Sequence, residues 1–211
     1  MMDKKSLALG IALLAGASAA SAEGFGVAVN TGLVGLGVGT GADITYSVHP
    51  MVNVRGGFMG GTKSADVTIE ANDFAITSKV NTMGVYADWM IFAGDLRLTA
   101  GYVTNSGNIN LTASGNIDFG GAGTVNTTVD ADIDFKASPY VGIGWGNAAE
   151  QDDTFGFNVD VGVLLDSKPT ATINSAAGAS PAQIAALEDE LAGDNAMKML
   201  PVITVGLTYH F

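Results

Sequence analysis

The sequence predicts an all-β fold, a transmembrane antiparallel up-and-down β-barrel of eight strands, on three observations. Apolar residues make up 47% of the chain and charged residues only 14%. Through most of the chain the apolar residues alternate with Gly, Thr, Asn, Ser or Asp, which is the period of strands with two unlike faces. Past the N-terminus, no apolar run approaches the roughly 18 to 20 residues that a membrane helix needs. Any membrane crossing is therefore expected to use strands.

The N-terminus has the three parts of a secretory signal peptide. Lys4 and Lys5 form the basic part, Leu7 to Ala17 form a short apolar part, and Ala20 and Ala22 supply the small residues of a cleavage site. An N-terminal membrane anchor is the alternative, but the apolar stretch is short. We expect a signal peptide at residues 1–22 and a single outer-membrane barrel domain at residues 23–211.

Eight alternating segments follow the signal peptide, and they are the expected strands. They are Phe25 to Asn30, Leu36 to Val48, Met51 to Met59, Ala75 to Phe92, Leu96 to Leu111, Thr127 to Gly146, Phe155 to Asp166 and Leu200 to Phe211. Short connections (49–50, 93–95 and 147–154) alternate with long polar ones (60–74, 112–126 and 167–199). Bacterial outer-membrane barrels have short periplasmic turns and longer extracellular loops. The short connections should therefore face the periplasm.

The first hairpin can be interpreted in two ways. Phe25 to Val48 could be one overlong strand, which would make the count seven. Single-chain bacterial barrels have even counts, so we place a turn near Thr31 to Gly35. Gly32 and Gly35 would allow the backbone to reverse there.

Each strand has one apolar and one polar face. In Val129 to Trp145 the odd-numbered residues are apolar and are expected to face lipid, whereas Asp130, Asp132 and Asp134 should face the lumen. Charges would be very costly in a closed apolar core, so the polar faces should point inward. By strand parity, a buried charge network should close the lumen at mid-height. Its expected members are Asp43, Arg55, Asp88, Arg97 and Asp160.

Aromatic residues collect near the predicted strand ends on the short-turn side, as in a membrane-interface girdle. They are Tyr46, Trp89, Trp145, Phe157, Tyr209 and Phe211. A soluble β-sandwich with these rings in its core is the alternative. The Tyr209-His210-Phe211 ending resembles the last strand of outer-membrane proteins, whose final Phe is read by the barrel-assembly machinery. That resemblance implies an assembly signal at Tyr209 and Phe211.

Several blocks resemble an uncharacterised proteobacterial family of small outer-membrane barrels, related to the OmpA-like, OmpX-like and OmpW-like barrels. The blocks are Ala87 to Trp89, Leu96 to Gly101, Pro139 to Asn147 and Phe155 to Gly162. The resemblance implies a fold and a location in the outer membrane of a Gram-negative bacterium. It brings no established activity and no site residues.

The residue types give little support to catalysis or to a cofactor. There is no Cys, and the two histidines, His49 and His210, fall on the short-turn side. We therefore predict no catalytic residues, no cofactor and no metal. Asp130, Asp132 and Asp134 would lie about 6 to 7 Å apart along one strand, so a solvated ladder in the lumen is favoured over a weak divalent-ion site. The net charge of −12 argues against nucleic acid as a partner.

A short helix is expected in the last extracellular loop. Ser180, Pro181 and Gln183 are typical of an N-cap, an N1 proline and a capping-box partner, and the helix should run to about Leu191. Its apolar side, with Ile184 and Leu187, favours packing against the loop over a ligand-gating lid.

Two functions remain open at this point. The first is a non-enzymatic structural or surface barrel of the cell envelope, its lumen filled by side chains. The second is a narrow channel or binding cup for a small (hydrophobic) molecule. The expected partners are outer-membrane lipid and lipopolysaccharide, periplasmic chaperones and the barrel-assembly machinery, and the protein is expected to be a monomer.

Overall fold

The computed structural model describes residues 24–35, 37–69, 72–91, 95–105, 108–119, 122–146, 155–166, 169–192 and 199–210. The predicted cleavage residues Ala20 and Ala22 and the terminal Phe211 lie outside these ranges. In the part of the chain that the structure describes, no helix is long and apolar enough to cross a membrane.

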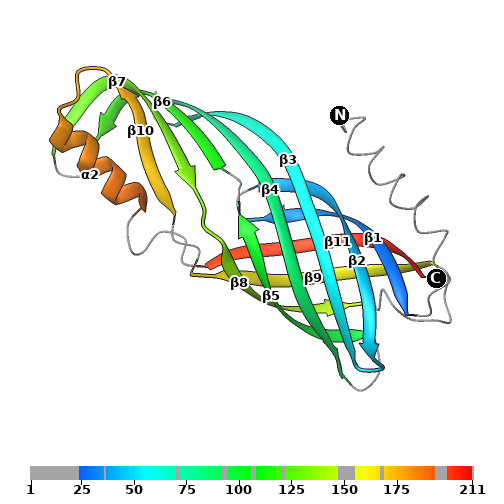
Figure 1. Cartoon of the computed structure of the whole chain (residues 1–211). Coiled ribbons are helices and arrows are strands. Elements are labelled where there is room, and N and C mark those ends of the chain that lie inside the picture. The colour runs from blue at the N-terminus through cyan, green and yellow to red at the C-terminus, as the bar shows by residue number, and fades with distance from the viewer. Residues whose placement is uncertain are drawn as a thin grey trace.

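Eight strands close into a ring with antiparallel neighbours, so the predicted eight-stranded up-and-down barrel is confirmed (Figure 1). Pairing of the first strand with the last closes the ring, which leaves no exposed strand edge in the wall that the eight described strands form. Around the ring the strands are β1 (Phe25–Val34), β2 (Gly37–His49), β3 (Val52–Ile69), β4 (Asn72–Met90), β5 (Leu96–Asn105), β8 (Ser138–Trp145), β9 (Phe155–Leu165) and β11 (Met199–His210).

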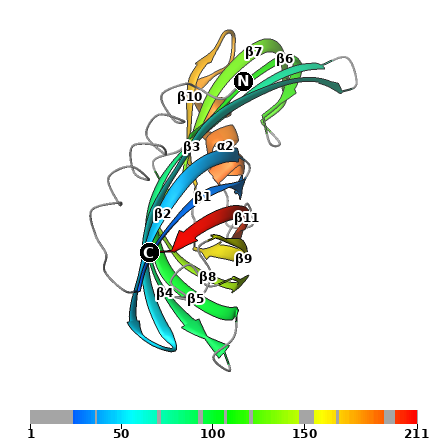
Figure 2. The same ribbon diagram turned by 90° about the vertical axis from the view of Figure 1, so that its right-hand side faces the viewer.

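Beyond one end of the barrel, further elements form what we call the extension (Figures 1 and 2). They are β6 (Asn108–Asp118), β7 (Thr124–Asp134), β10 (Thr170–Ala176) and α2 (Pro181–Ala192), joined to the far ends of β3 and β4. The opposite end of the barrel, with the β2–β3 and β4–β5 connections and the end of β11, is called the short-turn end.

The extension grows directly out of the barrel wall. β5 and β6 pair with β4 in one continuous register, since Asn105 lies opposite Thr82 and Asn108 lies opposite Lys79. The predicted strand Leu96 to Leu111 therefore corresponds to β5 and the first part of β6. β4 belongs to the wall along its second half and to the extension along its first.

The prediction of a single strand from Thr127 to Gly146, with one face toward lipid, is wrong. It divides into β7 and β8, and Asp134 lies opposite Asn108 instead of position 107, which the β5–β8 register would require. A shift of one residue reverses the face to which every side chain points. The apolar row of β7 is therefore buried, with Ile133 only 6% exposed, whereas in β8 Ile143 is 47% exposed.

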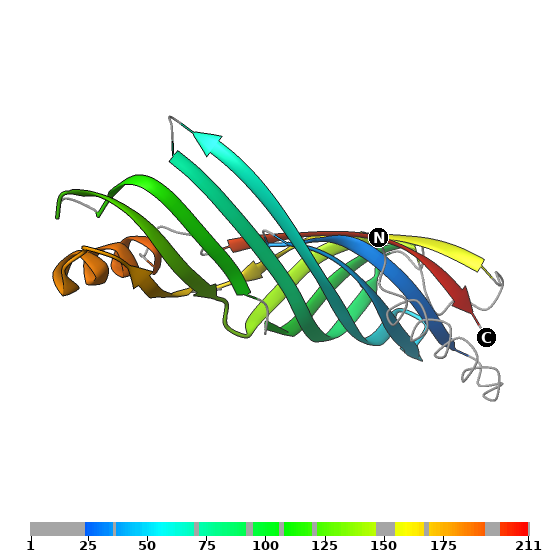
Figure 3. The ribbon, with the colours of Figure 1, turned by 90° about the horizontal axis from the view of Figure 1, so that it is seen from above.

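The three long connections that were predicted as polar loops contain strands. Hydroxyl and amide side chains pair across them, as in Ser64 with Thr77 at 2.9 Å and Ser114 with Thr128 at 3.0 Å. Such cross-strand pairs stabilise a sheet even where both partners are polar, and Thr favours strands. The β3–β4 hairpin consequently projects far past the barrel (Figure 3).

The first hairpin exists but turns later than predicted. β1 continues to Val34, and the reversal occurs at Gly35, whose φ of 60° lies in the left-handed region. Gly32 is not part of the turn. It pairs with Thr204 and Gly39 inside the sheet.

The outer wall of the barrel is apolar and its short-turn end carries exposed rings. Among the predicted girdle residues, Tyr46, Trp89, Trp145 and Phe157 are exposed. Tyr209 is half-buried and its ring lies 5.1 Å from that of Phe155. The inward residues of the same strands are mostly polar or glycine, as β11 shows with Thr204, Gly206, Thr208 and His210.

Candidate functional site in the barrel lumen

Side chains fill the lumen in layers that can be followed along β9. From the short-turn end, its inward residues are Asn158, Asp160, Gly162 and Leu164. In the same order, they mark four parts of the lumen: a polar part at the short-turn end, a charge layer, a glycine-lined part, and an apolar layer next to the extension. The charge layer is defined here as Asp43, Arg55, Asp88, Arg97 and Asp160, the five residues that the sequence suggested.

Arg55 joins the three carboxylates of the charge layer. Its Nε donates to Asp88 Oδ2 at 3.0 Å, and its Nη1 donates to Asp43 Oδ2 at 3.1 Å and to Asp160 Oδ2 at 3.3 Å. The guanidinium also lies 4.7 Å from the ring centre of Tyr86. All five side chains of the layer are at most 12% exposed, so the layer spans the lumen between β2, β3, β4, β5 and β9.

Arg97 is bound chiefly to Asp160. Its Nη2 donates to Asp160 Oδ2 at 2.8 Å, and its Nη1 donates to the carbonyl oxygen of Gly146. Its Nε lies 3.9 Å from Asp88 Oδ1, beyond hydrogen-bond distance. Arg97 therefore ties the charge layer to the end of β8.

Three polar residues that the sequence reasoning did not single out extend the charge layer. Asn30 Nδ2 donates to Asp43 Oδ2 at 2.7 Å, and Asn158 Nδ2 donates to Asn30 Oδ1 at 3.0 Å. Thr99 Oγ1 donates to Asp88 Oδ1 at 2.6 Å. With these bonds Asp43 and Asp88 each accept from an arginine and from a neutral donor, which fixes their orientation, whereas Asp160 is held by both arginines.

Two tyrosines lie across the lumen above the charge layer. The rings of Tyr86 and Tyr140 meet edge to face at a centroid distance of 5.4 Å. Tyr86 covers Gly84, and Tyr140 covers Gly142 and Gly162, so a Cβ at any of these glycines would collide with a ring. The sequence carried a signal for this arrangement, since each Tyr lies two residues from a Gly on the same strand face.

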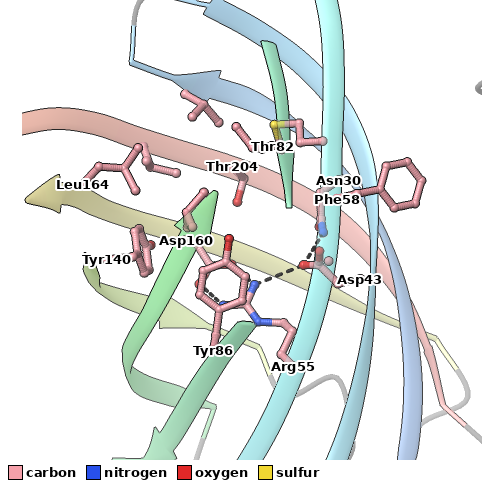
Figure 4. Close-up of a pocket in the computed structure, with 15 residues that line it drawn as sticks. Asn30, Asp43, Arg55, Phe58, Thr82, Tyr86, Tyr140, Asp160, Leu164 and Thr204 are labelled. Carbon is pink, nitrogen blue, oxygen red and sulfur yellow. Dashed lines mark hydrogen bonds and ion pairs between the residues drawn. The ribbon is translucent and has the colours of Figure 1, made fainter. Parts of the chain in front are cut away.

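A cavity of about 50 Å³ remains above the charge layer, between Asp43, Asp160, Tyr86 and Thr204 (Figure 4). That volume holds only a few water molecules. On the extension side, an apolar layer closes the lumen. It combines barrel residues with residues of the extension: Val103, Tyr140, Leu164, Leu200 and Val202 with Ile109, Ile133, Phe135 and Ala171.

The physical effect of these layers is to obstruct the lumen. Buried charges need partners, because removing one partner of a buried pair costs about 3–5 kcal/mol. A solute could cross only by breaking the Arg55 and Arg97 contacts and by displacing the tyrosine rings and the apolar layer. The arrangement therefore suits a rigid plug.

The acidic row of β7 lies outside the lumen, contrary to the predicted lumen ladder. The reversed face of β7 places Asp130 and Asp132 on the exposed side of the extension, where they are partly exposed. Asp130 accepts hydrogen bonds from Ser175 at 2.6 Å and from Thr112 at 2.8 Å, and these bonds hold the pKa of its carboxyl below the usual range. Among the described residues, no cluster of three or more His, Cys, Asp or Glu side chains could hold a metal ion.

The two histidines lie in different environments. His49 is exposed at the end of β2, where its Nδ1 accepts a hydrogen bond from the backbone N–H of Met51 at 3.2 Å. His210 is 7% exposed at the lower end of the lumen, with Nε2 3.3 Å from Thr208 Oγ1.

The predicted helix is present as α2 and packs within the extension. Glu188 accepts a hydrogen bond from the backbone N–H of Ile173 at 2.8 Å, and Gln183 donates to the carbonyl oxygen of Ala122 at 3.1 Å. Leu191 and Ala192 pack against the apolar layer. These contacts agree with the loop-packing interpretation of the helix.

The wall and the lumen together define the class of protein. An apolar exterior around a charged interior reverses the arrangement of a soluble protein and matches a barrel surrounded by lipid. The class is the small integral β-barrel of the outer-membrane type, with a filled lumen.

Comparison with solved structures supports this fold. The crystal structure of CarO from Acinetobacter baumannii superimposes with a TM-score of 0.64 and 20% identity, over 88% of this chain and 97% of CarO. CarO2 from the same organism gives 0.63 and 19%, over 89% of this chain and 98% of its own. No family model and no curated protein matches the sequence. At these identities the likeness shows a shared fold, as the resemblance to small outer-membrane barrels implied.

Proposed function

We propose that this protein is an integral barrel of a Gram-negative outer membrane with a non-enzymatic, structural or surface role and a closed lumen. The observation that carries the proposal is the pairing of both buried arginines with carboxylates across five strands. Paired charges favour a plug, whereas unpaired charges along a glycine-lined wall would favour a conduit. The short-turn end then faces the periplasm and the extension faces the cell exterior.

The partners follow from this location. Outer-membrane lipid surrounds the apolar wall, and lipopolysaccharide surrounds it at the outer leaflet. Periplasmic chaperones and the barrel-assembly machinery bring the chain to the membrane, with Tyr209 and Phe211 as the proposed assembly signal. The ring closes within one chain, so a monomer is sufficient for the barrel.

Conductance in a planar lipid bilayer tests the closed lumen. Wild-type protein should show no sustained current, because the charge layer and the apolar layer both block the path. Tyr86→Ala should raise the frequency of current steps, since it removes a ring that fills the lumen. Tyr102→Ala is the matched control, because Tyr102 is 54% exposed on the outer wall. A steady wild-type current would contradict the proposal.

The alternative function, a narrow channel or binding cup, receives less support from the cavity. Its volume of about 50 Å³ is far below the roughly 300–1,000 Å³ of ordinary ligand sites. Its floor is also made of charges that are already paired.

A further inference from the structure

The cavity above the charge layer has a charged floor and an apolar roof. Asp43, Arg55 and Asp160 of the charge layer border it on one side, and Leu164 and Val202 of the apolar layer border it on the other. Its volume of about 50 Å³ has room for roughly three or four water-sized particles. The charge layer therefore faces a small space that a few waters or a small ion can fill.

One carboxylate oxygen of the charge layer accepts no hydrogen bond in the described part of the barrel. Arg55 Nη1 and Asn30 Nδ2 both donate to Asp43 Oδ2, at 3.1 and 2.7 Å, and neither donates to Asp43 Oδ1. Oδ1 lies over Gly57, where a Cβ would collide with it, and Gly57 also borders the cavity. The glycine thus leaves space for this oxygen at the edge of the cavity.

Side chains with hydroxyl groups border the same cavity from three further strands, and these hydroxyls have no hydrogen-bond partner among the described residues. They belong to Thr82 on β4, Tyr140 on β8 and Thr204 on β11, which are 5%, 3% and 8% exposed. Figure 4 shows the Thr204 oxygen pointing toward the hydroxyl end of Tyr86, which also borders the cavity. Buried hydroxyls are normally bonded, so these oxygens have lone pairs available for a ligand.

The charge layer has one more carboxylate than guanidinium. Its three aspartates and two arginines give it a formal charge of −1. His210, at the short-turn end of the lumen, lies six residues along β11 from Thr204, which pairs with Asp160, so it is about 20 Å away. The apolar layer carries no charge. An uncompensated charge in an interior is strongly unfavourable, so a positive charge is expected next to the layer.

We propose that the cavity binds one monovalent alkali cation, sodium or potassium. Asp43 Oδ1 is its charged ligand, and the hydroxyls of Thr82, Tyr140 and Thr204 are its neutral ligands. Oxygen atoms are the ligands that hard cations prefer, and a single positive charge balances the formal charge of the layer. A divalent ion would reverse the sign of that charge. The inference rests on the proposed closed barrel, since the charge layer and the apolar layer enclose the ion between them.

Thermal unfolding in different chloride salts tests the cation. The protein is refolded into detergent micelles in sodium, potassium or N-methyl-D-glucamine chloride at equal ionic strength, so that screening of surface charges is the same. The glucamine cation is too large for the cavity. A ligand that binds only the folded state stabilises it, so at least one alkali salt should raise the unfolding midpoint by a few degrees. Equal midpoints in all three salts would overturn the proposal and would leave the closed barrel, which conductance measures, intact.

Variants of β11 locate the bound ion. Thr204→Val removes one neutral ligand, so the alkali concentration that gives half of the stabilisation should rise several-fold. Thr208→Val is the matched control, because Thr208 lies on the same face of β11, four residues closer to the short-turn end, and does not border the cavity. It should keep the wild-type concentration. An unchanged concentration in Thr204→Val would mean that the ion binds elsewhere and would overturn the proposal.

Asp43→Asn removes the charged ligand and keeps the size of the side chain. Its charge layer is formally neutral, so its midpoint should be the same in all three salts. An alkali effect of wild-type size in this variant would also overturn the proposal. If Asp43→Asn does not fold, the comparison of Thr204→Val with Thr208→Val decides the matter alone.

Discussion

At the scale of single residues, the two arginines of the charge layer have unequal roles. Arg55 contacts all three carboxylates, whereas Arg97 has one short ion pair, to Asp160. The distances of 2.8 Å to Asp160 and 3.9 Å to Asp88 favour Asp160.

A double-mutant cycle measures this pair. Arg97→Ala should destabilise the barrel by about 3–5 kcal/mol, because it leaves buried carboxylates with less compensation. Adding Asp160→Ala should cost less than the sum of the single changes, since each substitution removes the same contact. Urea-dependent folding into lipid vesicles gives the free energies. Strict additivity would show that the two side chains do not interact, and the cycle of Arg97 with Asp88 should lie closer to additivity.

Asp130 provides a pH-dependent readout outside the barrel wall. Its pKa is lowered by hydrogen bonds from Ser175 and Thr112, so these bonds stabilise the extension above the pKa of the unfolded chain. Their contribution is lost as the pH falls through the lower folded pKa. Titration of the Asp130 carboxyl carbon by NMR should show this low value, and Ser175→Ala should raise it. An unchanged titration in Ser175→Ala would contradict the assignment.

At the scale of elements, α2 shows a helix whose start is set by local sequence. Ser180 Oγ accepts a hydrogen bond from the backbone N–H of Gln183 at 3.3 Å, and Gln183 Oε1 accepts one from the backbone N–H of Ser180 at 2.9 Å. This reciprocal pair is the capping box that the sequence predicted.

Loss of the cap should weaken α2 and leave the barrel unchanged. Ser180→Ala removes one half of the capping box, which costs about 1 kcal/mol. Amide hydrogen exchange in residues 181–192 should become several-fold faster, while exchange in β11 stays the same. Ser64→Ala, in the part of the β3–β4 hairpin that projects past the barrel, is the control for a hydroxyl lost away from α2. Faster exchange throughout β11 would mean that the helix supports the barrel itself.

β7 and β8 show how one residue of register changes the environment of a strand. Alternation continues without a visible break from Val129 to Trp145, yet the pairing shifts between Asp134 and Ser138. Ser138 Oγ donates to the carbonyl oxygen of Lys136 at 3.0 Å within this irregular stretch. The shift allows β7 to turn its apolar side toward the apolar layer.

At the scale of the whole molecule, the strand pairs that form the barrel wall do not include β6, β7 or β10 of the extension. β5 meets β8 through Val103 and Ser138, and β9 meets β11 through Leu165 and Met199. Short turns could therefore replace residues 106–137 and 167–198 without removing a wall strand.

A chain shortened in this way should still fold as a barrel. On unheated gels it should migrate faster than after boiling, as the full chain is expected to do, because closed barrels resist unfolding in detergent. It should unfold at a lower temperature, since it loses the extension half of the apolar layer. Equal migration before and after boiling for the shortened chain, with normal behaviour of the full chain, would show that the extension is required for ring closure.

The sequence by itself determined the number of wall strands, their two faces and the capped helix, because alternation and capping are local patterns. The inward parity of Asp43, Arg55, Asp88, Arg97 and Asp160 was also visible in the sequence. Only the tertiary structure decided which arginine meets which carboxylate, since those contacts depend on the stagger of strands distant in the sequence. It also decided that polar segments form the extension and that β7 reverses its face. A one-residue shift in register leaves no mark on the alternation of residues, yet it exchanges the buried and exposed faces of a strand.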